Sequence, residues 1–351
     1  MKKKIAVIGS GFFGVSSSLI LSKKYDVDLY EKEKTILCGA SRANQMRFHL
    51  GYHYPRSLKT LKEVNELKDE FTKFYGFDIF GKTKNFYGVS TVGSKTSYKK
   101  YLNFLKKNKL KFKKVKCKDF GKIIKGVIIC NEKNLNYFKI KKKILKKLKK
   151  SNVNLYLNTT FKKDLINNYE KIIVSVYDQN NIVLNSLGIK PLKKFKYELV
   201  EKIIIKLPKY YKNKSYMIID GKFVCLDPYL GTKYHLISDV KYSKIEKKIG
   251  LYPNFNNKRK KFLNTGIVKN KKISEFRNFI AHGSKYLPFL NKAKYIGSFF
   301  VTRAVEVNKE KTDERLNLIK KINKKFITIF SGKWNTCVSV AKHVDGLISN
   351  D

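Results

Sequence analysis

The chain has 351 residues, of which 42% are hydrophobic and 13% aromatic, so it is long enough for about two domains and too apolar to be intrinsically disordered. Its formal net charge is +50, but only seven of the 77 basic residues are arginine. Together with abundant asparagine, isoleucine and tyrosine, this excess of lysine favours an AT-rich coding bias over a nucleic-acid-binding surface, although a polyanionic partner stays open.

The chain begins with the pattern of a nucleotide-binding unit. Lys4–Ile8 is a short apolar run that predicts a buried parallel strand, and residues 12–24 predict a helix. Between them, Gly9, Gly11 and Gly14 stand in G-x-G-x-x-G spacing. In this motif the first glycine permits the tight turn, the second lets the backbone approach a pyrophosphate, and the third lets the helix pack against the strand.

A second strand and a terminal acid complete this unit. Residues 27–30 predict the strand, and Glu31 follows it 22 positions after Gly9. A carboxylate at this place accepts hydrogen bonds from the ribose hydroxyls of an adenine dinucleotide and disfavours a 2′-phosphate. The sequence therefore predicts a Rossmann-like dinucleotide site. Its predicted cofactor-binding residues are Gly9, Gly11, Phe12, Phe13, Gly14 and Glu31.

The rare arginines indicate where a guanidinium is needed. Lysine would serve wherever a point charge is enough, whereas a bidentate grip on a carboxylate or phosphate requires arginine. Three of the seven arginines lie between Arg42 and Arg56. This stretch is the first candidate for a functional site.

Helices and strands are both expected in the middle of the chain. Residues 56–74 carry apolar side chains at helical spacing, and residues 135–150 predict an amphipathic, lysine-rich helix. Single strands are expected at 153–157 and 171–177, and consecutive strands within 195–240. The consecutive strands predict an antiparallel sheet.

The C-terminus predicts a strand followed by a helix. Phe326–Phe330 forms the strand, and Gly332–Thr336 opens a helix that is expected to run to about Val344. The orphan N–H groups and the positive dipole end at such a helix start stabilise negative charge.

Three segments resemble one protein family. Gly39–Ser41 resembles the G-A-S segment of the D-amino-acid oxidase (DAO) superfamily of FAD-dependent oxidoreductases. Residues 44–59 are similar to the H-x-G-x-x-Y-x-x-x-S-L-K stretch of L-2-hydroxyglutarate dehydrogenase relatives. Residues 331–336, S-G-K-W-N-T, are similar to the G-G-K-W-T-T segment of glycerol-3-phosphate dehydrogenases.

The resemblance implies an enzyme that passes hydride to FAD from an amine- or hydroxyl-bearing carbon of a small carboxylate, such as an amino acid, a hydroxy acid or a sugar-derived acid. In the family, the G-A-S stretch runs along the pyrophosphate, the start of the final helix faces the flavin pyrimidine edge, and Phe161 would lie beside the adenine through its backbone. The further cofactor-binding residues implied in this way are Ser41, Arg42, Phe161, Gly332, Lys333, Trp334, Asn335 and Thr336.

The resemblance also implies the residues of the substrate site. His49 or His53 would accept the proton of the substrate heteroatom, because an imidazole of near-neutral pKa changes charge readily. His49 also lies near the position at which some dimethylglycine dehydrogenase relatives attach flavin covalently. A carboxylate substrate calls for a fixed guanidinium. The predicted substrate-binding residues are Arg47, Tyr54, Tyr229 and Arg303.

These elements predict an α/β fold with a Rossmann-like FAD-binding domain and an inserted α+β substrate domain whose sheet is mostly antiparallel. The FAD-binding domain is expected to be discontinuous, formed by residues 1–78, 135–188 and 292–351. Residues 79–134 and 189–291 are expected to form the substrate domain.

Two alternative functions stay open at this point. A DAO-like module also modifies wobble-uridine side chains of tRNA, which would suit the +50 charge, and a redox-neutral flavoenzyme resembling UDP-galactopyranose mutase would act on nucleotide-sugars. Oxygen, quinone and protein all stay open as electron acceptors. The five cysteines have no C-x-x-C spacing, so we expect no metal site, no disulfide framework and a cytoplasmic protein. No apolar stretch of about 20 residues predicts a transmembrane helix.

Overall fold

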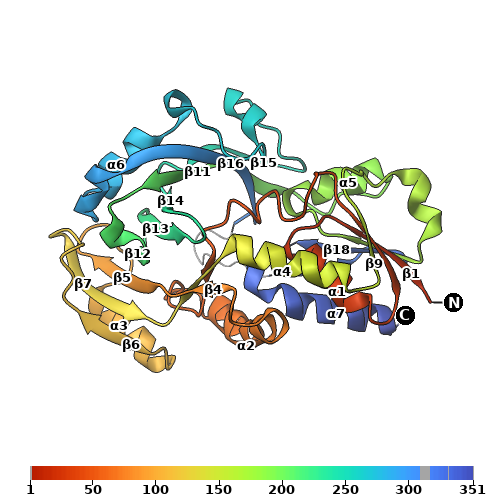
Figure 1. Ribbon diagram of the computed structural model, residues 1–351, viewed down its shortest axis with the longest axis horizontal. Coiled ribbons are helices and arrows are strands. Elements are labelled where there is room, and N and C mark those ends of the chain that lie inside the picture. The colour runs from red at the N-terminus through yellow and green to blue at the C-terminus, as the bar shows by residue number, and fades with distance from the viewer. Residues whose placement is uncertain (1, 309–316, 331, 351) are drawn as a thin grey trace.

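The computed structural model describes residues 2–308, 317–330 and 332–350. It has two parts, one around a six-stranded sheet and one around a nine-stranded sheet, and both ends of the chain lie at the outer end of the first part (Figure 1). The predicted fold class, an α/β nucleotide-binding part with a mostly antiparallel second sheet, is confirmed.

The six-stranded sheet is parallel apart from one edge strand. Its strands are, in spatial order, β17 (Leu318–Lys321), β18 (Phe326–Phe330), β10 (Lys171–Val174), β1 (Lys4–Ile8), β2 (Asp26–Tyr30) and β9 (Val153–Tyr156). Only β17 runs antiparallel, to β18. In the centre, Val7 lies opposite Leu29 on one side and Ile173 on the other. Both faces of these strands are buried, which explains why the sequence shows continuous apolar runs here.

Helices cover both faces of the six-stranded sheet. One face packs against α1 (Phe12–Leu21), α4 (Tyr137–Lys149) and α7 (Cys337–Ser349), and the other packs against α5 (Asn180–Ser186). Every residue of α1 is buried because this helix lies between the sheet and α7. The final helix extends to Ser349, beyond the predicted end at about Val344.

The nine-stranded sheet forms the second part. Along its main path the strands are β15 (Lys244–Gly250), β11 (Phe195–Lys206), β14 (Tyr234–Asp239), β13 (Val224–Tyr229), β12 (Lys214–Ile219), β5 (Lys84–Ser90), β7 (Ile124–Cys130) and β6 (Phe112–Val115). The ninth strand, β16 (Lys294–Glu306), pairs with the free edge of β11 along its whole length. All neighbours are antiparallel except β12 and β5.

The position of β16 corrects one predicted domain boundary. Residues 292–351 were assigned as a whole to the FAD-binding domain, but Lys294–Glu306 pairs with β11 from Phe195 to Lys206. The physical reason is that a strand can form its backbone hydrogen bonds with the edge strand of either sheet. The local sequence does not specify which sheet it joins. The chain therefore returns to the six-stranded sheet only after β16.

Three more helices and a small sheet complete the fold. α3 (Tyr98–Lys107) and α6 (Phe276–Gly283) pack on opposite faces of the nine-stranded sheet. α2 (Leu58–Tyr75) begins after Ser57, whose hydroxyl accepts a hydrogen bond from the amide of Thr60. The small sheet consists of β3 (Arg47–Phe48), β8 (Lys133–Leu135) and β4 (Phe80–Gly81).

The described ranges contain neither a membrane-spanning helix nor a cluster of metal-binding side chains. None of the helices there is both long and apolar enough to cross a lipid bilayer. In the same ranges, no three His, Cys, Asp or Glu side chains gather in a way that could hold a metal ion.

Candidate active site

The glycine-rich turn joins β1 to α1 at the carboxyl edge of the six-stranded sheet. Gly9 has a φ of +97°, and a Cβ on Gly14 would lie 1.8 Å from the carbonyl oxygen of Gly9. A side chain on Gly11 would come within 3.3 Å of the Ser41 hydroxyl. Gly11, which precedes α1, has no side chain to cap the helix, so the start of α1 suits an anion.

Glu31 lies beside this turn, at the end of β2. Its carboxylate accepts hydrogen bonds from the amide (2.9 Å) and hydroxyl (2.5 Å) of Ser10 and from the amide of Glu33 (3.0 Å). The backbone carbonyl of Glu31 accepts from the amide of Thr159, and Phe161 packs edge-on against Tyr30. The structure thus brings the two predicted adenosine-side segments together.

The loop that contains Ser41 and Arg42 runs past the start of α1. The amide of Phe12 donates to the Ser41 hydroxyl at 3.4 Å. The Arg42 guanidinium lies 5.4 Å from the ring centre of Phe299 on β16. Its buried Nε atom has no hydrogen-bond partner among the described residues. A buried donor without an acceptor is costly, so this atom is suited to a ligand oxygen.

The structure brings the predicted histidine stretch and the C-terminal segment into contact. The His49 ring lies 5.8 Å from the His53 ring and 5.6 Å from the Tyr54 ring, centre to centre. The Lys333 ammonium stands 5.0 Å from the Tyr54 ring centre, and the Asn335 side-chain amide donates to the His49 carbonyl at 3.3 Å. Residues nearly 300 positions apart in sequence therefore form one cluster.

His49 has an environment that keeps its imidazole neutral. Burial lowers its pKa well below the ordinary 6.5, and the nearby charges of Lys333, His53 and Arg47 lower the pKa further. Its Nδ1 atom is 3.8 Å from a carboxylate oxygen of Glu132 and has no hydrogen-bond partner among the described residues. A neutral imidazole in this position is able to accept a proton.

Arg47, one of the predicted substrate-binding residues, is buried in an ion pair. It is only 1% exposed, and its Nη2 donates to Asp227 Oδ1 and Ser215 Oγ, both at 2.7 Å. Its Nη1 lies 3.7 Å from Glu132. Its Nε and Nη1 atoms have no hydrogen-bond partner among the described residues. Arg47 joins β3 to the nine-stranded sheet through a buried ion pair.

The other predicted substrate residues differ in their access to solvent. Arg303 on β16 is 38% exposed, and its Nε donates to Glu198 at 2.6 Å. Tyr229 is 3% exposed and packs against Phe138 and Phe299. Arg303 is therefore the only one of the two predicted arginines that presents part of its surface, and Tyr229 is a core residue.

The segment before α7 is held mainly by buried contacts. Trp334 packs against Phe12 and Phe71, so its side chain belongs to the core and only its backbone faces the start of α7. The amide of Gly332 donates to Asn317, and the Thr336 hydroxyl donates to the carbonyl of Lys333 at 2.7 Å. α7 continues the short turn Trp334–Thr336, whose carbonyl at Trp334 accepts from the amide of Cys337, so the positive end of the helix dipole lies at this turn.

The sequence analysis missed a polar group on the face of the nine-stranded sheet that turns toward the first part. Lys202 on β11 lies between Val200 and Ile204, which belong to the core cluster shared with α1 and α7. Nearby on the same face, Gln45 Nε2 approaches Cys225 Sγ (2.9 Å) and Ser238 Oγ (3.2 Å). In the sequence, Lys202 falls among the polar alternate positions of this strand, with Lys196, Glu198 and Lys206, so local pattern alone did not single it out.

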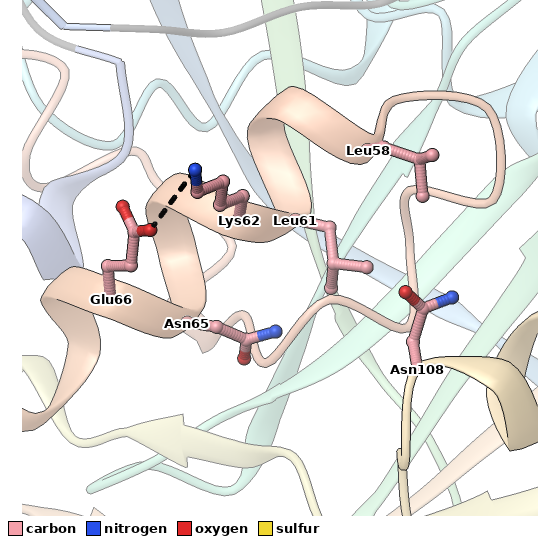
Figure 2. Close-up of a pocket in the computed structure, with 6 residues that line it drawn as sticks. All are labelled: Leu58, Leu61, Lys62, Asn65, Glu66 and Asn108. Carbon is pink, nitrogen blue, oxygen red and sulfur yellow. Dashed lines mark ion pairs between the residues drawn. The ribbon is translucent and has the colours of Figure 1, made fainter.

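A separate surface hollow lies on the exposed side of α2 (Figure 2). Its lining residues are Leu58, Leu61, Lys62, Asn65, Glu66 and Asn108. The two charged side chains form an exposed i,i+4 ion pair at 3.8 Å, a contact worth at most about 0.5 kcal/mol. No predicted site residue lines this hollow, so it is not the candidate active site.

The parallel sheet, the uncapped glycine turn and the acid at the end of β2 define a Rossmann-like dinucleotide-binding protein with a second sheet domain. A family model described as "FAD dependent oxidoreductase" (DAO) matches residues 4–219. The chain belongs to this family. FAD is therefore its cofactor, and it is an oxidoreductase.

Comparisons with individual proteins agree with the family. L-proline dehydrogenase from P. horikoshii superposes with a TM-score of 0.72 at 14% identity, covering 99% of this chain and 94% of that one. Dithionite-reduced L-alpha-glycerophosphate oxidase from Mycoplasma pneumoniae with FAD bound gives 0.71 at 14% identity, covering 99% and 95%. The FAD-dependent monooxygenase FPY4 of Fusarium mangiferae is 30% identical over 98 residues, which is 28% of this chain and 27% of that relative.

The described residues fit FAD. The N–H groups at the start of α1 suit its diphosphate, and Glu31 lies where a ribose is expected. The unpartnered Arg42 Nε and the small Gly11 fit a negatively charged group that passes close to the backbone.

Proposed function

We propose that this enzyme oxidises a carbon that bears an amine or hydroxyl in a small carboxylate-containing substrate. The observation that carries the proposal is the cluster in which a neutral His49 meets His53, Tyr54 and the segment before α7. The names of the two superposed proteins support a small anionic substrate, since proline carries a carboxylate and glycerophosphate carries a phosphate in its place.

The chain's residues have separate tasks in this proposal. FAD supplies the hydride acceptor. The N–H groups at the start of α1 and the side chains of Glu31 and Arg42 hold the cofactor, and the positive dipole end of α7 stabilises negative charge. His49 accepts the proton that the substrate amine or hydroxyl loses, with His53 as its neighbour. The packed sheet face over this region excludes water.

The test of the proposed function is a reductive titration. The purified, FAD-loaded protein is mixed anaerobically with amino acids, hydroxy acids and glycerophosphates, and bleaching of the flavin absorbance is followed. Bleaching by at least one class, with recovery on adding an electron acceptor, is the expected result. Turnover of a nucleotide-sugar without any acceptor would contradict the proposal and favour a redox-neutral enzyme.

His49→Asn is expected to lower the rate of flavin reduction by the substrate about a hundredfold while FAD stays bound, because the proton acceptor is lost. In the wild type, the pKa of His49 lies well below 6.5, so kcat/KM should be constant above that pH and fall only in more acidic solution. Stopped-flow reduction rates and a pH profile measure both effects. His343→Asn, a change of another histidine, in α7, is the control. Equal rates for His49→Asn and the wild type would remove His49 from the mechanism.

Glu31→Gln is expected to weaken FAD binding about tenfold. The amide still accepts from Ser10 but loses the charge that favours ribose hydroxyls, and a hydrogen bond to a charged group is stronger than a neutral one by about 1 kcal/mol. Fluorescence quenching during reconstitution of the apoprotein with FAD gives the dissociation constant. Glu33→Gln, two positions further on and half-exposed, should leave it unchanged. A smaller loss of FAD affinity in Glu31→Gln than in Glu33→Gln would contradict the placement of Glu31 at the ribose.

A further inference from the structure

Lys202 stands on a strand face of β11 where the nearest residue on each side, Val200 and Ile204, is apolar. Its side chain is half-buried, and Val200 and Ile204 on the same face are core residues. In the register of the sheet, Lys202 lies opposite Phe299 of β16. The Arg42 guanidinium lies 5.4 Å from the centre of the Phe299 ring. Lys202 therefore lies between the nine-stranded sheet and the loop proposed to hold FAD.

Lys202 differs from its charged neighbours because it has no counter-ion. Among the described residues its ammonium has no hydrogen-bond or ion-pair partner, whereas Arg303 and Lys244 share the carboxylate of Glu198 at 2.6 and 3.7 Å. Asp227 is near Lys202 but is engaged by Arg47. The region thus holds more positive than negative charge, and a half-buried cation without a partner is unfavourable.

The polar groups next to Lys202 are arranged as the wall of a binding site. Gln45 comes from the same loop as Arg42 and points its side-chain amide at Cys225 and Ser238. Its buried Oε1 has no partner among the described residues. A second unpartnered polar atom close to an unpaired cation indicates that a polar ligand completes this face.

We propose that Lys202 binds the oxyanion group of the substrate, a carboxylate or a phosphate, and thereby determines the specificity of the enzyme for anionic substrates. This inference rests on the proposed function, because it places the substrate between the nine-stranded sheet and the FAD-binding loop. Arg303 adds positive charge at the same face, and the Gln45 oxygen is placed to accept from a donor on the substrate. Burial and the charge of Arg303 lower the pKa of Lys202, and a bound anion would raise it again.

Calorimetric titration with simple anions tests the proposal without the need for a known substrate. FAD-loaded wild type is titrated with benzoate in one arm and with inorganic phosphate in the other, while the flavin spectrum is recorded. At least one anion should bind, and the arm in which it does identifies carboxylate or phosphate. Lys202→Met should weaken this binding about tenfold or more and Lys202→Arg should retain it. The matched control Lys206→Met, an exposed lysine on the same strand, should not change it.

Several results would overturn the proposal. They are the absence of binding of both anions to the wild type, unchanged binding in Lys202→Met, and loss of FAD from Lys202→Met, which would assign the lysine to the cofactor. Thermal melting gives a second readout: removing an unpaired cation should raise the melting temperature, whereas a purely structural lysine would lower it. Failure of the proposed function would look different, because anions would bind normally while no amine or hydroxyl compound bleached the flavin.

Discussion

Gly14→Ala is expected to destabilise the protein by about 3 kcal/mol or more and to abolish stable FAD binding. The added Cβ would lie 1.8 Å from the carbonyl oxygen of Gly9 and 3.6 Å from a methyl group of Val7. The obstacle is backbone, which cannot rotate away as a side chain can. Gly9 itself is held at a φ of +97°, with Ser175 and Val176 packed against it, so the turn cannot retreat. Urea unfolding and the flavin absorbance after purification measure both losses.

Gly346→Ala provides the matched control. Gly346 also lies in a helix of the FAD-binding part, α7, but a Cβ there meets no atom within 4 Å. The same substitution should therefore stabilise the protein by about 0.5 to 1 kcal/mol, because alanine favours helix and restricts the unfolded chain. A Gly14→Ala protein as stable and as yellow as the Gly346→Ala protein would contradict the close packing of α1 on the turn.

The nucleotide-binding part was predictable because its signals are local. The bounds of β1 and β18 agree with the predicted runs Lys4–Ile8 and Phe326–Phe330, since both strands are buried on two faces and bounded by turn residues. The roles of Gly9 and Gly14 follow from the turn itself. For these residues the sequence window that dictates the conformation is only a few positions long.

The remaining features depend on partners far away in the chain. The buried pair of Arg47 and Asp227 joins residues 180 positions apart, and no local pattern in the sequence predicts such a pair. The place of β16 has the same origin, because its pairing with β11 is decided by tertiary contacts that the sequence analysis did not predict. Lys202 is unusual only in the folded structure, where no carboxylate among the described residues forms an ion pair with it. The sequence indicated which residue types were unusual. The contacts of each of these residues are set by the tertiary fold.

Arg47→Met is expected to lower the free energy of unfolding by about 3 to 5 kcal/mol, because it leaves buried carboxylates without their cation. Asp227 is fully buried and would keep only the hydroxyl of Ser215 and the amide of Asn134 as donors. Glu132 is also fully buried; burial raises its pKa and Arg47 at present lowers it, so in the variant Glu132 should be protonated more readily. Chemical denaturation at neutral pH measures the loss. Arg277→Met, an exposed arginine of α6, should change stability by about 0.5 kcal/mol or less.

A second substitution separates the lost ion pair from lost packing. If the uncompensated carboxylate causes the instability, Arg47→Met combined with Asp227→Leu should recover most of it, since apolar groups can replace a buried ion pair at little cost. The single variant should also shift the acidic limb of the pH profile upward, because the Arg47 charge helps to lower the pKa of His49. An unstable double variant with an unshifted pH profile would mean that Arg47 acts by its volume alone, and the electrostatic link between the buried pair and His49 would be refuted.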